Sequence, residues 1–180
     1  LRVDRQSIAL RDGVLTDVHV VMSWAARVIA GDCRAGDLHV TPYGLDAMEL
    51  LSGCYDDWVL MERERVRQRM LHAMEALSRA LVRSGRCAEA VETAMIAVSA
   101  EPLRETAQRT LLEAHLAEGN WIEGRRGYET YRNLLAAELR AEPDPALRRM
   151  LCQRALAMQA APQFLRARES GAGTSRQELP

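Results

Sequence analysis

The sequence contains no lysine, since all 24 basic residues among its 180 are arginine. This absence excludes enzymes that need a lysine ε-amino group, such as P-loop nucleotidases and enzymes that hold pyridoxal phosphate as a Schiff base. Aromatic residues are also scarce, at 4%, whereas strands favour aromatic and β-branched residues. The abundant Ala, Leu and Arg favour helix instead. The composition therefore predicts a mostly helical protein outside the lysine-dependent enzyme classes.

Other absences narrow the setting of the protein. No apolar run reaches about 18 residues, so we expect no membrane span and no membrane partner, and we expect no signal peptide. The net charge of −1 provides no overall positive field for nucleic acid. No C-x-x-C motif links the cysteines, and scattered thiols are typical of a reduced, cytoplasmic protein. These cysteines are Cys33, Cys54, Cys87 and Cys152.

A repeat of 34 residues runs through the second half of the chain, and 34 is the period of tetratricopeptide (TPR) helical hairpins. Gly85 and Gly119 are separated by this interval, and each follows a run with helical spacing. Further pairs at the same interval are Leu77 and Leu111, Arg86 and Asn120, Cys87 and Trp121, and Ala94 and Tyr128. Proteins of this type stack their hairpins and usually bind a partner.

Apolar spacing and capping residues predict seven helices. Asp17 is the expected N-cap of the first helix, and Gly31, Gly85 and Gly119 are expected stops. The fold class we predict is all-α, with TPR-like antiparallel hairpins stacked into one right-handed superhelix. The expected helices span residues 18–30, 42–52, 59–84, 88–100, 103–117, 121–140 and 145–160.

The two ends of the chain are expected to differ from this helical part, which we assign to residues 17–160. Short apolar runs flank Asp12-Gly13, a dipeptide typical of hairpin turns, so residues 1–16 are predicted to form a β-hairpin. Residues 161–180 include a run of Gly, Ser, Thr, Arg, Gln and Glu and are predicted to be a flexible tail.

Two kinds of residue cluster with acidic members could form sites. Asp56, Asp57 and Trp58 precede a helix, where paired carboxylates can act as acid and base; we favour helix capping and dipole compensation, with Trp58 as a buried anchor. His-x-x-Glu pairs begin at His72 and His115, and residues three apart on a helix can share a metal. We favour polar packing for both pairs, and expect no metal, cofactor or catalytic group.

Arginine clusters offer a different kind of site. The cluster from Arg63 to Arg69 alternates with Glu, which favours a solvated, ion-paired face. Arg125 and Arg126 have fewer acidic neighbours and are the better candidates for a contact surface. The nearby aromatic residues Trp121, Tyr128 and Tyr131 either line a groove or fill the core between hairpins, and the sequence leaves both possibilities open.

One stretch resembles a known family. Residues 50–59 read Leu-Leu-Ser-Gly-Cys-Tyr-Asp-Asp-Trp-Val and continue into Glu-Arg-Glu-Arg-Val-Arg at 62–67. They resemble the bacterial transcriptional activator domain (BTAD) of SARP-type regulators, whose form is commonly Leu-Leu-Pro-Gly-Trp-Tyr-Asp-Asp-Trp-Val. The chain departs from that form at Ser52 and Cys54. Within the similar segment, which covers residues 15–152, Tyr55, Asp57 and Trp58 are candidate structural or interaction residues.

The resemblance implies a cytoplasmic transcriptional activator rather than an enzyme. Its TPR-like module would self-associate, as a dimer, and contact RNA polymerase subunits. In this family a winged helix-turn-helix domain precedes the module, and residues 1–16 are similar to its last strands. We therefore expect a fragment that binds DNA only through a winged helix absent from this chain. The alternative is a stand-alone TPR scaffold that binds a peptide or partner protein.

Overall fold

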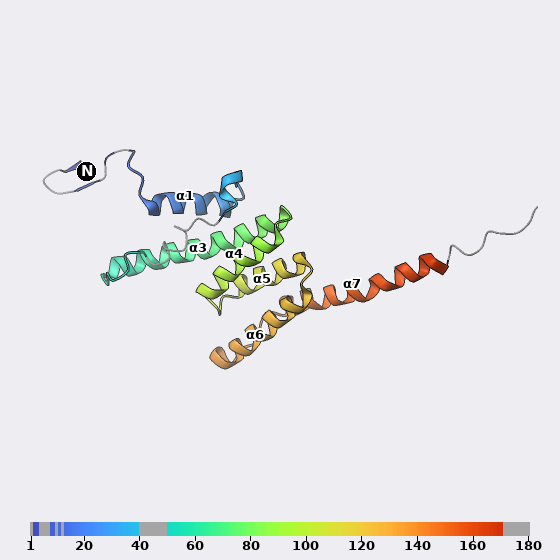
Figure 1. Cartoon of the computed structure of the whole chain (residues 1–180). Helices are drawn as coiled ribbons and strands as arrows, with labels where there is room; N and C mark the ends of the chain where they lie inside the picture. Colours follow the sequence, from blue (N-terminus) through green and yellow to red (C-terminus); the bar gives the residue numbers. More distant parts are fainter. Residues whose placement is uncertain (1, 4–7, 10, 12, 40–49, 171–180) are drawn as a thin grey trace, which may run out of the picture.

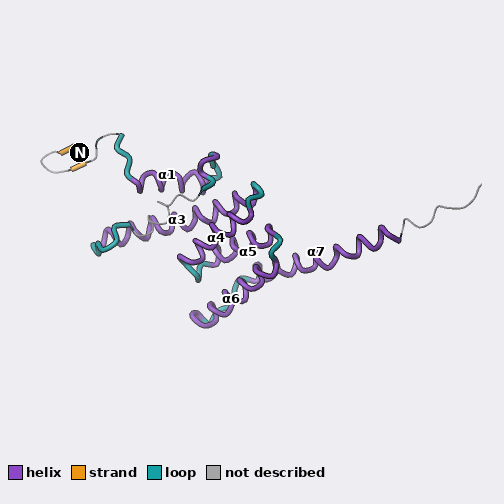
Figure 2. Tube along the Cα trace, in the orientation of Figure 1, coloured by secondary structure: helices purple, strands orange, loops and turns teal. Residues whose placement is uncertain are grey.

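The protein is helical over most of the residues that the structure, a computed structural model, describes: 2–3, 8–9, 11, 13–39 and 50–170 (Figures 1 and 2). The predicted helical class is confirmed, because these residues contain six α-helices and one short 3₁₀ helix, η1 (Ala35–Asp37). The α-helices are α1 (Asp17–Ala30), α3 (Asp57–Arg83), α4 (Cys87–Ala100), α5 (Glu105–Glu118), α6 (Trp121–Leu139) and α7 (Pro145–Ser170). None of them combines the length and apolar character that a membrane span requires.

The helix ends follow the expected local chemistry with one correction. Gly31, Gly85 and Gly119 follow α1, α3 and α5 with left-handed φ values of 82°, 78° and 92°, a conformation that glycine adopts without a Cβ penalty. The N-cap of α1 is Thr16 rather than Asp17, and its hydroxyl accepts a hydrogen bond from the His19 N–H at 3.3 Å. Asp17 instead occupies the first turn, where its charge suits the helix dipole.

The N-terminal prediction is wrong about the turn. The structure pairs Arg2–Val3 with Ile8–Ala9, antiparallel and two residues long, so Asp12-Gly13 lies after this ladder and does not join its strands. No strand follows Gly13 in the described part, because Thr16 already caps α1. A ladder this short is far from a self-supporting hairpin.

Two other predicted helices differ from the structure or fall outside its described part. The helix expected at 42–52 falls mainly on residues 40–49, which lie outside the described part; residues 50–53 form a turn. The last helix, expected to end near Ala160, continues through Pro162 to Ser170. Proline removes one helical N–H, but the surrounding Ala, Gln, Leu and Arg residues are good helix formers. Flexibility of 161–180 stays a prediction.

Consecutive helices pack against one another along the chain, α3 on α4, α4 on α5, α5 on α6 and α6 on α7, while α1 covers α3 and α3 also reaches α5. Close approach depends on small residues. Ala90 is fully buried, and its carbonyl accepts a hydrogen bond from the Ser78 hydroxyl at 2.8 Å. Gly124 occupies the place 34 residues later, where an added Cβ would lie 3.0 Å from Leu112 Cδ1. Each site therefore brings two helices close together.

The described residues form two separate hydrophobic clusters. The first joins α1, α3, α4 and α5, and includes Trp24, Met70, Leu77 and Ala97. The second joins α5, α6 and α7 through Leu112, Tyr131, Leu135, Leu147 and Leu151. Burial of this apolar surface is the main source of stability for such a stack.

A polar clamp fixes the chain that follows α1. The Asp37 carboxylate accepts hydrogen bonds from Arg27 at 2.7 and 3.0 Å and from the Arg34 N–H at 3.0 Å. The Asp37 carbonyl accepts a further bond from the Trp24 indole N–H at 3.0 Å. The Arg27 side chain thus lowers the pKa of Asp37 from 3.8 to about 2.

This clamp predicts a specific pH dependence. The pKa of Asp37 is lower in the folded than in the unfolded chain. The contribution of the Asp37 carboxylate to the free energy of unfolding is therefore fully present above about pH 4 and is lost as the pH falls toward 2. Urea unfolding at several pH values in this window should show a shallower loss of stability for Asp37→Asn than for the wild type. If the free energy of unfolding fell equally with pH in the wild type and in Asp37→Asn, the clamp would not stabilise the fold.

Candidate functional site

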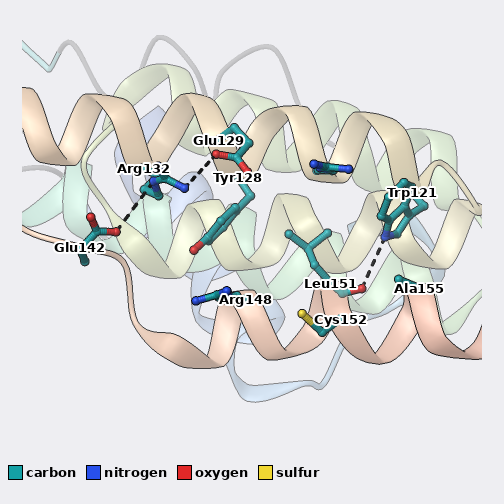
Figure 3. A pocket seen from close by; sticks show the side chains of 10 residues that line it. Trp121, Tyr128, Glu129, Arg132, Glu142, Arg148, Leu151, Cys152 and Ala155 are labelled. Atoms are coloured by element: carbon teal, nitrogen blue, oxygen red, sulfur yellow. Dashed lines mark hydrogen bonds and ion pairs between the residues drawn. The ribbon is translucent and has the colours of Figure 1, made fainter.

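A groove of about 350 Å³ lies between α6 and α7 (Figure 3). We refer to it as the α6–α7 groove. In Figure 3 the Tyr128 and Leu151 side chains occupy the space between the two helices, with Trp121 at one end and Arg132 toward the other. Its lining residues are Trp121, Arg125, Tyr128, Glu129, Arg132, Glu142, Arg148, Leu151, Cys152 and Ala155.

Trp121 anchors one end of the groove. Its indole N–H donates to the Leu151 carbonyl at 3.4 Å, which ties the start of α6 to α7. The Arg125 guanidinium, one turn further along α6, lies 5.6 Å from the centroid of the Trp121 ring. This cation–π contact combines a flat apolar surface with a positive charge.

The other end of the groove is polar. Arg132 forms ion pairs with Glu129 at 3.2 Å and with Glu142 at 3.9 Å, as the dashed lines in Figure 3 show. Arg148 enters from α7 on the side that Tyr128 faces. The charged lining therefore consists of three guanidiniums and two carboxylates, and both carboxylates pair with the same arginine.

The structure separates the aromatic and basic residues that the sequence grouped together. Trp121, Arg125 and Tyr128 line the groove. Tyr131 is only 2% exposed and belongs to the second hydrophobic cluster; burial raises the pKa of its phenol, and the nearby charge of Glu105 adds to this effect. Arg126 lies outside the groove lining on the exposed side of α6, where it pairs with Glu123 at 3.2 Å.

A second surface lies where the chain enters α3. Tyr55 is 79% exposed and Trp58 is 61% exposed, so the interpretation of Trp58 as a buried anchor is wrong. Val59, the next residue along, is fully buried and takes the inward position instead. Trp58 and Met61, one helical turn apart, share a face of α3. Leu51, Tyr55, Trp58 and Met61 are all exposed, and we call them the α3 entry patch.

The turn that carries part of this patch is held by Arg63. Its guanidinium donates to the carbonyls of Leu50 and Leu51 at 2.8 Å each and to that of Cys54 at 3.1 Å. Sequence reasoning missed this role and placed Arg63 on a solvated face, since residues 9–13 positions apart give no local signal of contact. Asp57 lies in the first turn of α3, as the dipole interpretation requires.

The remaining members of the arginine cluster divide in two. Arg65 pairs with Glu62 at 2.9 Å on the exposed surface, as predicted. Arg67 pairs with Glu64 at 3.4 Å and also reaches Glu101 and the Ala100 carbonyl at the end of α4. The hydrogen bond to Glu101 raises the pKa of Arg67. The cluster therefore includes tertiary clamps as well as a solvated face.

The first His-x-x-Glu pair belongs to a network between α3 and the start of α5, in which Glu75 is buried and His72 is exposed. Glu75 is 3% exposed and accepts from Arg104 Nε at 2.6 Å and from the Thr106 hydroxyl at 2.7 Å. Arg104 also contacts Gln68 at 2.9 Å and His72 at 3.1 Å. Because the Glu75 carboxylate is already bonded to a guanidinium and a hydroxyl, it contributes to polar packing between the helices, which is the interpretation we favoured over a metal site.

The second pair does not converge on a common point. Glu118 accepts from the Asn120 side chain at 2.7 Å. His115 Nδ1 is buried and finds no hydrogen-bond partner among the described residues; it lies next to the close contact between α5 and Gly124. Across the part of the chain that the structure describes, no three His, Cys, Asp or Glu side chains gather as metal ligands would.

Comparison with models of protein families identifies a family for this chain. The model described as bacterial transcriptional activator domain matches residues 44–154, more than half of the chain. This segment contains the α3 entry patch, the Glu75 network and nearly all of the α6–α7 groove. No curated protein and no solved structure matches the chain.

Proposed function

The chain belongs to the bacterial transcriptional activator domain family, and from this premise we propose that residues 17–160 are the regulatory module of a SARP-like DNA-binding activator. The module acts in the cytoplasm through protein–protein contacts: it self-associates and contacts RNA polymerase subunits, while a winged-helix domain reads the DNA. The family match is the observation that carries this proposal. The domain is one of transcription regulators and not of an enzyme family.

We also propose that the helices form TPR-like hairpins in a right-handed superhelix. Three features support this arrangement. Left-handed glycines at 85 and 119 end corresponding helices, Ala90 and Gly124 provide close approach at the same interval, and α3 packs on both α4 and α5. In a TPR stack each repeat contacts only the neighbouring repeats, and these contacts are consistent with that arrangement.

The α3 entry patch is the surface we assign to protein contacts. Its aromatic side chains resemble interface anchors, because Trp and Tyr are enriched where partners bind. The three bonds from Arg63 hold the turn in one shape, which reduces the entropy that binding must overcome. A second copy of the chain is the partner to test first.

Analytical ultracentrifugation of the wild type and Trp58→Ala tests this assignment. We expect a concentration-dependent dimer whose Kd rises at least tenfold, about 1.4 kcal/mol, in the variant. Leu139→Ala is the matched control, since Leu139 is exposed to a similar degree but lies at the end of α6; its Kd should not change.

The alternative outcomes are distinct. A monomer at every concentration, together with equal capture of polymerase subunits by wild type and Trp58→Ala, would exclude the patch as the contact surface. Capture of peptide tails in place of polymerase would favour the stand-alone scaffold.

A further inference from the structure

We propose that the α6–α7 groove binds a small organic anion, a single carboxylate attached to a flat apolar ring system. The inference depends on the groove alone, so it holds or fails independently of the role of the module in transcription. It assigns a ligand site to a surface distinct from the α3 entry patch.

The charges of the groove favour a negatively charged ligand. Glu129 and Glu142 both pair with Arg132, so within the described residues Arg125 and Arg148 have no carboxylate of their own. Arginine presents a planar fork of donors that matches a carboxylate in a two-point contact. The three guanidiniums and two carboxylates of the lining leave one net positive charge, which suits a monoanion better than a phosphate dianion.

The apolar part of the groove suits a ring. The Trp121 and Tyr128 side chains lie on the α6 side, and Leu151 and Ala155 on α7. Because the Trp121 indole N–H already donates to the Leu151 carbonyl, what remains of that side chain for a ligand is apolar ring surface. Aromatic side chains bind flat apolar groups by offset stacking.

The volume selects a small molecule over a protein segment. About 350 Å³ lies at the lower end of the range found for small-molecule sites. A helix or strand of a partner would need a longer channel, whereas one fused ring with its carboxylate fits within this space. The cation–π contact between Arg125 and Trp121 keeps charge and ring adjacent in the free protein, so part of the site is already organised.

Isothermal titration of the full chain with 2-naphthoate and with its neutral analogue 2-naphthylmethanol provides the test. We expect saturable binding of the naphthoate and at least tenfold weaker binding of the alcohol, because the carboxylate contributes charge-assisted hydrogen bonds. Arg125→Gln and Arg148→Gln should each weaken naphthoate binding about tenfold. Arg126→Gln is the matched control on the same helix, and its Kd should equal that of the wild type.

Cys152 provides a positional readout, because it lines the groove and is an exposed free thiol. Bound naphthoate should slow its alkylation by iodoacetamide without slowing that of Cys87, which lies outside the groove. Circular dichroism checks that both arginine variants keep the wild-type helicity. The proposal is overturned by equal binding of acid and alcohol, by an equal loss in Arg126→Gln, by no saturation up to millimolar naphthoate, or by unprotected Cys152. Tight binding of a peptide carboxyl terminus with no naphthoate binding would likewise overturn it.

Discussion

Replacing Leu77 with Ala should lower the free energy of unfolding by about 3 kcal/mol, because the side chain is fully buried in the cluster that joins α1, α3, α4 and α5. Truncating a buried leucine loses its transfer free energy and leaves a cavity, which together cost about 2–5 kcal/mol. Urea denaturation followed by circular dichroism measures the change, and an unaltered m-value would show that the unfolded state is not affected.

The 34-residue repeat supplies the matched control for this variant. Leu111 occupies the equivalent position in α5 but is only half-buried, so Leu111→Ala should cost about 1 kcal/mol, from the smaller apolar area that it removes from the interior. Equal losses at both positions would mean that the two hairpins are packed equally tightly, contrary to the difference in burial.

The second large effect is expected at Glu75. Glu75→Ala should cost about 3 kcal/mol at neutral pH, because removing one partner of a buried ion pair leaves the other charge uncompensated. Here the partner is Arg104, held at 2.6 Å, and the Thr106 hydroxyl also loses its acceptor. The loss is measured by the same denaturation experiment.

Two further variants test whether the lost ion pair with Arg104 causes the destabilisation. Glu62→Ala removes an exposed i,i+3 partner of Arg65 and should cost at most about 1 kcal/mol, as exposed pairs do. A double-mutant cycle with Arg104→Ala should show that the two single losses are not additive. Additive losses would mean that Glu75 acts through α3 alone and does not connect that helix to α5.

Much of the helical framework could be predicted from the sequence, since its signals are local. A glycine that must adopt positive φ, such as Gly85 or Gly119, marks the end of a helix by its own backbone chemistry. The N-cap at Thr16 was missed by one residue because Asp17 has the same capping preference. The prediction of a hairpin turn at Asp12-Gly13 was wrong because a turn dipeptide forms a hairpin only when the strands on its two sides pair with each other.

The candidate surfaces were less predictable, because burial depends on contacts between distant residues. Trp58 is predicted to be a buried anchor at the start of its helix, yet Val59 occupies the inward position and the Trp58 indole is exposed. The sequence gives no signal that separates Trp121, Tyr128 and Tyr131. Only the packing of α7 against α6 shows that the first two line a groove while the third is buried. The groove also needs Arg148 and Cys152 from α7, and nothing local in the sequence indicates that this helix lies against α6.

The position of α5 between the two clusters has a consequence for communication within the molecule. Ala107 and Ala114 pack into the first hydrophobic cluster, while Leu112 packs into the second. The same helix therefore contributes side chains to both clusters. Tightly packed helices shift as rigid units rather than deforming. A rotation of α5 that improves contacts beside the α6–α7 groove must therefore displace side chains facing α3 and α4. We therefore expect occupancy of the groove to affect the packing of α3 and α4 through α5, which contacts both parts of the stack.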